Sequence, residues 1–454
     1  MNTLLFFSLF ATLAIFYTIL GFFASTKVST TNDYFLAGRD LGLFSITMTL
    51  IATQIGGGML IGTSENAYLY GIYGLLYTIG MTIGFALLAA GFARRLQVIN
   101  VSTTAEIFEK KYNSLFLKQI ASFLSIITMS GLLVGQIVAS RTIIDSLNLG
   151  MATEWLFLSF WIFVILYTMA GGLKAVVITD VFQVLLIIFI FAGVFIYSLL
   201  YGPPFAWNSI GALQKEFFGT VPISLNALVA TVSMPALFSL IEQDLAQRFF
   251  AARTPRIAAL GALLSCIGII LFALIPIYFG MQAKLLGIVV PVGTSPLIPV
   301  IEFLTNEFVV MLCLCAIIAA ITSTADSLLC AVSSNVAQDF ELKWIGLPDA
   351  LYRSKVITLV LGIAALIASY FVPQNVITIL IDSYAISVSC LLVPLLVAYC
   401  SDRVSKSGAI AAVICGGIAF ILIPFWNTEL PKVLAPVLIS AIAYCLVAAF
   451  TKSD

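Results

Sequence analysis

Apolar residues occur along this chain in long continuous runs rather than in short alternating segments. A helix that crosses the hydrocarbon core of a bilayer needs about 20 mostly apolar residues. Continuous runs of this length indicate helices, because the strands of a membrane barrel alternate apolar and polar side chains. The sequence therefore predicts an all-α polytopic membrane protein. Its thirteen transmembrane helices are expected at 3–25, 42–66, 72–93, 117–146, 153–170, 175–200, 222–245, 256–281, 308–336, 354–372, 376–400, 408–426 and 432–450.

Two of these runs contain residues that interrupt a helix at a similar depth. Gly56, Gly57 and Gly58 follow one another in the first, and each is about 1 kcal/mol less favourable than Ala in a helix. The second contains Ser233 and Pro235, and the proline removes a backbone hydrogen bond. Glycines also let helices pack closely, which is an alternative explanation. Broken helices at matching positions of two repeats are typical of transporters with a midplane binding site.

Each interrupted helix opens a group of five spans, which predicts two repeats at 42–200 and 222–400. Because five is odd, the second repeat must be inverted relative to the first. An additional helix at 3–25 precedes the repeats, and two helices within 408–450 follow them. Most of the 21 Lys and Arg residues fall in loops that are cytoplasmic if the N-terminus is outside and the C-terminus inside. We therefore predict a single transmembrane domain with a five-plus-five inverted repeat, N-out and C-in.

Composition narrows the class of protein further. Only 9% of the residues are charged, whereas a soluble domain averages about 25%, so soluble and nucleic-acid-binding proteins are excluded. The chain has no histidine, which removes His-dependent catalytic triads and imidazole metal ligands, so we do not expect an enzyme. The expected surroundings are a lipid bilayer, with no nucleic acid and no obligate protein partner. The compact loops favour a plasma membrane, specifically a bacterial inner membrane.

Ionisable residues within apolar runs are candidates for function, because a charge at the bilayer centre costs about 2.5–3.5 kcal/mol. Asp326 lies in a stretch of hydroxyl residues from Thr322 to Ser327, an oxygen-rich set that suits a small hard cation such as Na+. The alternative is that these hydroxyls bond to their own helix. Arg141 and Asp145 are four residues apart and can pair on one helix face.

A second charged group closes the run 222–245. Glu242 and Asp244 are followed by Arg248, a spacing that permits local ion pairs. We expect these three residues to hold the cytoplasmic end of their helix.

The sequence resembles the sodium:solute symporter family, whose members have the LeuT-type five-plus-five fold. NDYFLAGRDLG at 32–42 is similar to the segment that leads into the family's broken helix. GGLKAVVITDVFQ at 171–183 and AAITSTADSLLCAVSS at 319–334 resemble its sixth-span and ninth-span motifs. The motifs occur in the family's order and on the predicted helices. The resemblance implies Na+-coupled import of a small solute by alternating access.

The resemblance also implies the ligands of the ions. For the main Na+ site these are backbone carbonyls and hydroxyls at Ala52, Ile55, Ala320, Ser323 and Thr324. Some members, including the sialic acid symporters, bind a second Na+, and the matching positions here are Asp180, Ser323, Asp326 and Ser327. Because Asp326 stands where those symporters have Ser, this second site either binds a cation more strongly or serves a proton.

The solute is indicated mainly by Arg141, which aligns with an arginine that holds the solute carboxylate in sialic acid symporters. A guanidinium suits a carboxylate because it can bind it bidentately. We therefore expect a carboxylate or an amino acid. Thr53, Gln54 and Gln136 lie near the predicted crossing of the broken helices and are candidate solute contacts.

Two alternatives remain for coupling and solute. A proton-coupled symporter would use Asp326 or Asp180 as the proton carrier. The segment ATQIGGG also resembles the choline transporters, but Gln54 replaces their tryptophan, and a quaternary ammonium favours an aromatic cage. Choline- or betaine-type uptake is therefore the second alternative.

Overall fold

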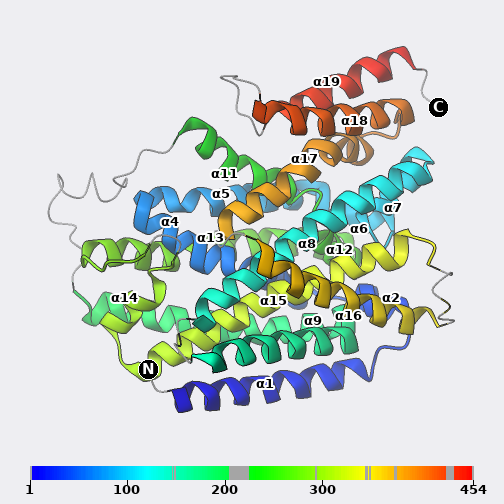
Figure 1. Cartoon of the computed structure of the whole chain (residues 1–454). Coiled ribbons are helices and arrows are strands. Elements are labelled where there is room, and N and C mark those ends of the chain that lie inside the picture. The colour runs from blue at the N-terminus through cyan, green and yellow to red at the C-terminus, as the bar shows by residue number, and fades with distance from the viewer. Residues whose placement is uncertain are drawn as a thin grey trace.

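The computed structural model describes residues 3–145, 147, 150–203, 224–291, 294–342, 346, 349–372, 376–425 and 434–451. Throughout these residues the chain is helical with short connections, and its long helices run across the molecule in similar directions (Figure 1). The N- and C-terminal ends lie at opposite ends of the helix bundle (Figure 1). The main helices are α1 Thr3–Ser25, α2 Thr31–Leu36, α3 Leu43–Gln54, α4 Thr63–Tyr70, α5 Leu76–Leu87, α6 Ala93–Ile99, α7 Thr104–Tyr112, α8 Leu115–Asp145, α9 Met151–Tyr201, α11 Leu225–Phe238, α12 Gln243–Phe250, α13 Pro255–Leu285, α14 Leu297–Leu304, α15 Glu307–Asp339, α16 Ala350–Ala368, α17 Val376–Cys400, α18 Lys406–Leu422 and α19 Ala435–Phe450.

Within the described residues, nine helices are long and apolar enough to cross a membrane. Three shorter apolar helices, α3, α18 and α19, fall on the remaining predicted runs. The helix α9 covers the two predicted spans 153–170 and 175–200. A straight helix of its 51 residues would be about 75 Å long, more than twice the hydrocarbon thickness of a bilayer. It is bent at Gly172, whose φ of 54° and ψ of −155° are not helical. A Cβ there would lie 2.4 Å from the carbonyl oxygen of Tyr34, so α2 packs directly against this bend.

Both predicted helix interruptions exist, but the second is displaced. The first lies between α3 and the single π-helical turn Gly58–Gly62, as the glycines predict. In the second repeat the prediction of a break at Ser233–Pro235 is wrong, because α11 continues through Pro235 to Phe238. The proline lacks only its own N–H, and one missing bond does not end the helix. The chain leaves the helix at Ser239, whose N–H and hydroxyl both donate to the Pro235 carbonyl, at 3.1 and 2.7 Å.

The helix α15 forms the centre of the molecule. It packs against α8 and α9 and also contacts α1, α3 and α12. Nearly every residue from Val310 to Asn335 is buried, including its serines and threonines. In contrast, α1 packs on α9, and α18 and α19 pack on each other at the edge of the bundle (Figure 1). The hydroxyl residues predicted to bind ions are therefore in the best-protected part of the protein.

The connections before α3 and after α12 meet at one end of the bundle. Leu41 and Ala252 form an isolated parallel bridge, and the Arg253 guanidinium donates to Asp40 at 2.6 Å. The hydrogen bond from Arg253, together with its charge, lowers the pKa of the exposed Asp40 carboxyl below its usual value. This contact ties the two broken helices together outside the apolar region.

Candidate functional site

The break in the first repeat brings backbone carbonyls of α3 against α15. α3 ends at Gln54, and Ile55 (φ −83°, ψ 70°) turns the chain away from the helix. The N–H of Gly57 donates to the Gln136 side chain of α8 at 2.9 Å. A Cβ at Gly56 would lie 2.5 Å from the Thr324 hydroxyl, so only glycine allows this approach of the two segments. The glycines therefore both open the helix and admit α15.

Four of the five groups predicted for the main Na+ site converge at this place. The Ser323 hydroxyl lies 3.1 Å from the Ala52 carbonyl oxygen and 2.9 Å from that of Ala320. The Thr324 hydroxyl lies 3.4 Å from the Ala52 carbonyl and 3.3 Å from the Ala320 carbonyl. Each hydroxyl can donate only one hydrogen bond, whereas each carbonyl and each hydroxyl oxygen carries two lone pairs, so the acceptor capacity of this group exceeds its available protons. Such a group of neutral oxygens has ligand capacity for a small cation.

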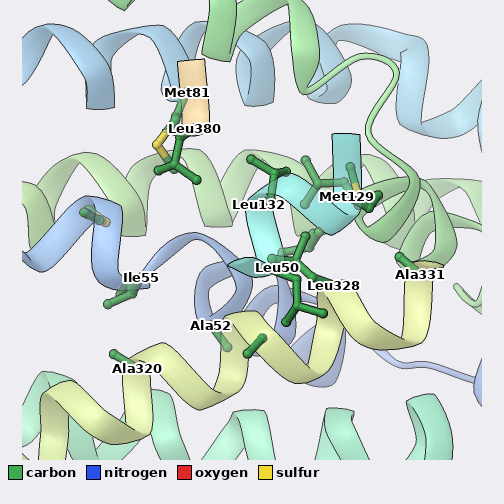
Figure 2. Packing of buried hydrophobic residues seen from close by; sticks show 14 of the residues in the cluster. Leu50, Ala52, Ile55, Met81, Met129, Leu132, Ala320, Leu328, Ala331 and Leu380 are labelled. Carbon is green, nitrogen blue, oxygen red and sulfur yellow. The ribbon is translucent and has the colours of Figure 1, made fainter. Parts of the chain in front are cut away.

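Ile55, the fifth group, is at the end of the same segment. Figure 2 shows Ala52 and Ile55 on the broken helix, facing the turn of α15 that carries Ala320. The Thr53 carbonyl also accepts from Thr324, at 3.1 Å, and was not expected from the sequence.

The four residues predicted for a second cation site do not converge. The Ser323 hydroxyl is directed to Ala52 and Ala320, and Asp326 accepts a hydrogen bond of 2.8 Å from Thr168 instead. Asp180 and Ser327 do lie close together, but a guanidinium from α12 binds them both. Ser323 therefore contacts the α3 and α15 carbonyls, Asp326 contacts Thr168, and Asp180 and Ser327 contact the guanidinium.

That guanidinium belongs to Arg248, which is fully buried. Its Nη2 donates to the Ser327 hydroxyl at 2.5 Å and to Asp180 at 3.4 Å, and its Nε donates to Thr49 at 2.9 Å. Thr49 in turn donates to the same Asp180 oxygen at 2.5 Å. Arg248 also donates to the Asp244 carbonyl of its own helix at 2.9 Å, but its role extends beyond the helix end that the sequence suggested. Its side chain joins α12 to α3, α9 and α15.

Asp326 has a different environment. It is fully buried, and one of its carboxyl oxygens accepts from Thr168, while the other has no hydrogen-bond partner among the described residues. Gln183 on α9 donates to Thr322, one turn before Asp326, at 3.2 Å. Asp326 therefore faces the α9 side of α15, whereas Ser327 faces Arg248.

A cavity of about 30 Å³ lies between the two helix breaks. Thr53, Gln54 and Gln136 line it, as the sequence predicts. This volume has room for no more than a few water molecules, far less than the about 300–1,000 Å³ of small-molecule sites, so an organic solute would fit only after the helices move apart. Among the described residues, the lining consists of Thr53, Gln54, Gly56, Gly58, Met59, Tyr77, Met81, Leu132, Gln136, Glu242, Asp244, Thr324, Leu328, Leu380 and Tyr384.

Several lining residues were missed by sequence reasoning. Glu242 and Asp244 were assigned to a helix end, but they lie at the start of α12, directly after the break, and face the cavity. Tyr77 and Tyr384 also line the cavity, and their hydroxyls are 2.9 Å apart. The sequence predicts the second break at Ser233–Pro235, but it lies after Phe238. A break at that later position would have indicated Glu242 and Asp244 as residues of the cavity.

Arg141 does not line the cavity. Its guanidinium donates to Glu154 at 2.6 Å and lies 3.9 Å from Asp145. It also lies over the rings of Phe157 and Tyr370, 5.0 and 4.9 Å from their centroids. The local pairing with Asp145 that the sequence offered is present, but Glu154 is the nearer partner. Nothing in this arrangement directs Arg141 toward a solute between the broken helices.

Residues 34–416 match the sodium:solute symporter family. The chain belongs to this family. It is 26% identical over 421 residues to the sodium/pantothenate symporter of Escherichia coli, which covers 88% of this chain and 85% of the relative. It is 27% identical over 391 residues to the high-affinity choline transporter 1 of Drosophila melanogaster, covering 78% of this chain and 60% of the relative.

A solved structure of a Na+-coupled sialic acid symporter in a substrate-bound outward-open state superposes with a TM-score of 0.81. It covers 99% of this chain and 98% of the other at 16% identity, so the similarity shows a shared fold. The chain is thus a multi-pass membrane protein and a sodium-coupled solute symporter rather than an enzyme.

Proposed function

We propose that the chain imports a small organic solute with one Na+, which binds between the broken α3 and the middle of α15. The convergence of the Ala52 and Ala320 carbonyls with the Ser323 and Thr324 hydroxyls carries this proposal. The Ile55 carbonyl is the fifth ligand in the proposed site. Neutral oxygens from an unwound helix can bind Na+ without a fixed charge that would hold it too tightly.

The proposed stoichiometry of one Na+ rests on Arg248. Its guanidinium already supplies a positive charge between Asp180 and Ser327, where the family resemblance implied a second cation. A buried carboxylate needs an opposite charge, and Arg248 provides it without an ion from solution. Asp180 is therefore neither a Na+ ligand nor a proton carrier in this proposal.

The solute is proposed to bind in the cavity between the two helix breaks, beside the Na+ site. Thr324 belongs to both, since its hydroxyl contacts the α3 carbonyls and it also lines the cavity. Na+ would hold the broken α3 against α15 and so order Gln54 and Gln136 for the solute. Each ligand then raises the affinity of the other by the same factor.

Of the two solute classes that the sequence favours, an amino acid fits better than a simple carboxylate, because its ammonium group has acidic partners in Glu242 and Asp244. The described lining of the cavity contains no Lys or Arg for the carboxylate of either class, and Arg141 is paired with Glu154 elsewhere. The choline-type alternative also retains support, because Tyr77 and Tyr384 supply aromatic surface despite Gln54. In all cases we propose import across a plasma membrane, specifically a bacterial inner membrane.

One Na+ can drive considerable accumulation. Moving one charge through about 100 mV releases about 2.3 kcal/mol, which corresponds to roughly a 50-fold concentration of a neutral solute. The test is uptake of labelled solutes into proteoliposomes with an imposed gradient of Na+ or of K+. We expect uptake only with Na+ and one Na+ per solute. Equal uptake with both gradients would contradict the proposal.

Proton coupling is kept as a second candidate because one oxygen of the buried Asp326 is unpartnered among the described residues. In that case a pH gradient alone would drive uptake, and Asp326→Asn would abolish it. If Na+ is the coupling ion, the variant should retain Na+-driven uptake within about threefold, since the Thr168 hydrogen bond can still form with the amide oxygen.

A further inference from the structure

An acidic pair lies at the second helix break and faces the solute cavity. Glu242 caps the N-terminal end of α12, and Asp244 is in its first turn. Both are buried, with 7% and 1% of their surface exposed, and their side chains interact directly with each other. Both line the cavity between the broken helices. Two carboxyl groups so close in a place without bulk water require a proton or a positive charge between or beside them.

Among the described residues that line the cavity, none is Lys or Arg. Arg248, one turn further along α12, directs its guanidinium to Asp180, Ser327 and Thr49 and donates to the Asp244 backbone carbonyl at 2.9 Å. Its charge also acts on Glu242 and Asp244, so three buried carboxyl groups share one guanidinium. One oxygen of Asp244 accepts from the Leu245 N–H at 2.8 Å. The helix end therefore stabilises part of the negative charge, and the rest faces the cavity.

The rest of the described cavity lining is largely aromatic and apolar. The Tyr77 and Tyr384 hydroxyls hydrogen-bond to each other, and the ring of Tyr384 stacks on Phe238 with centroids 4.4 Å apart. Met59, Met81, Leu132 and Leu380 belong to this part of the lining. Rings and thioethers suit the methyl or methylene groups around an ammonium nitrogen, and tyrosine rings attract the cation itself.

We propose that Glu242 and Asp244 bind the positively charged nitrogen of the solute, so that this symporter carries an organic cation. The inference rests on the proposed function, because it assigns a solute class to the same cavity. A zwitterion or an anion would bring a carboxylate beside two acids with no basic side chain to receive it. An inorganic cation would satisfy the acids but leave the aromatic and thioether wall without a role.

Carrying a cation also changes the charge that moves in each cycle. One Na+ with an organic monocation moves two charges per solute, whereas one Na+ with a zwitterion moves one. The ratio of charge to labelled solute in proteoliposomes on a solid-supported membrane therefore distinguishes the two. We expect a ratio of two.

The binding test is the thermal stability of the purified full chain in detergent with NaCl. The probes are the cations choline, ethanolamine and putrescine, the zwitterions proline and glycine betaine, and the anions acetate and pantothenate. We expect one or more cations to stabilise the protein and the zwitterions and anions to have no effect. Glu242→Gln and Asp244→Asn should each weaken the apparent affinity for that cation about 10- to 100-fold, as expected for a lost charge-assisted contact.

The control variant is Glu154→Gln, which removes an acid that pairs with Arg141 away from the cavity and should keep the affinity for the cation within about threefold. The Na+-induced stabilisation of each variant shows that it is folded. Stabilisation by a zwitterion or an anion instead of a cation would overturn the inference. If Na+ still stabilised the unmodified chain, the proposed function would be upheld. The inference would also be overturned if Glu242→Gln abolished the Na+-induced stabilisation and no organic cation stabilised the unmodified chain. That result would assign the acids to Na+ rather than to the solute. Absence of a Na+ response in the unmodified chain would contradict the proposed function itself.

Discussion

The two helix breaks, one in each of the repeats that the sequence predicts, differ in their chemistry. At the first, between α3 and Gly58, the contacts are made by neutral groups: glycines, backbone carbonyls, hydroxyls and the amide of Gln136. At the second, between Phe238 and Gln243, the adjoining residues include two acids and an arginine, all buried. One break is built from the backbone and the other from charged side chains.

This difference suggests that the two breaks serve different ligands. Neutral oxygens at the first suit Na+, which must bind and leave in every cycle. The charges at the second are partly satisfied within the protein, because Arg248 pairs with Asp180, and partly directed to the cavity through Glu242 and Asp244. The first break should therefore respond to changes of shape, and the second to changes of charge.

The largest effect is expected at the second break. Arg248→Ala leaves Asp180 buried without its positive partner, and breaking a buried pair in this way typically destabilises by about 3–5 kcal/mol. We expect a large loss of thermal stability and of uptake. The measurement is the melting temperature and the amount of monodisperse protein in detergent.

Two further variants sharpen this result. Arg248→Met combined with Asp180→Asn removes both charges and should recover much of the lost stability. Arg253→Ala removes an exposed arginine from the same end of the bundle, and we expect little change of the melting temperature. Equal effects of Arg248→Ala and Arg253→Ala would contradict the role given to the buried guanidinium.

The next effect concerns shape at the first break. In Gly56→Ala the new methyl group would lie 2.5 Å from the Thr324 hydroxyl, so α3 and α15 must move apart. We expect the apparent affinity for Na+ in uptake assays to fall at least about tenfold, which corresponds to about 1.4 kcal/mol. Gly193→Ala is the matched control, because a Cβ there meets nothing within 4 Å. An unchanged apparent affinity for Na+ in Gly56→Ala would contradict the proposal that Na+ binds between α3 and α15.

The smallest effect is expected for Pro235→Ala. The residue lies inside α11, and the break follows at Ser239, so the proline is not needed to open the helix. We expect uptake within about twofold of the unmodified chain. A loss as large as that of Gly56→Ala would mean that the proline, like the glycines, maintains the break in its repeat.

The fold and part of the site could be predicted because they depend on patterns that a sequence displays. Apolar runs revealed the helices, and the glycines at 56–58 revealed the first break. Ala52 and Ala320 could be assigned only by resemblance, because a carbonyl ligand leaves no trace in the side chain. For Arg248, nearness in sequence suggested ion pairs with Glu242 and Asp244, but its side-chain partners lie on α3, α9 and α15.

Two other residues show a different limit of sequence reasoning. Pro235 suggested a break because proline is usually disruptive, but the helix tolerates one missing donor. Arg141 suggested a carboxylate by alignment, but Glu154 satisfies it through a contact that sequence spacing does not reveal. For Arg141 the deciding interaction is with a neighbour that only the folded chain brings close.

The central claim is that Na+ binds between the broken α3 and α15. It is tested most directly by the melting temperature of the purified protein in NaCl and in KCl, for the unmodified chain and for Ser323→Ala/Thr324→Ala. The account predicts a higher melting temperature in NaCl for the unmodified chain and no difference between the salts for the double variant. A Na+ response of equal size in both proteins would contradict the claim.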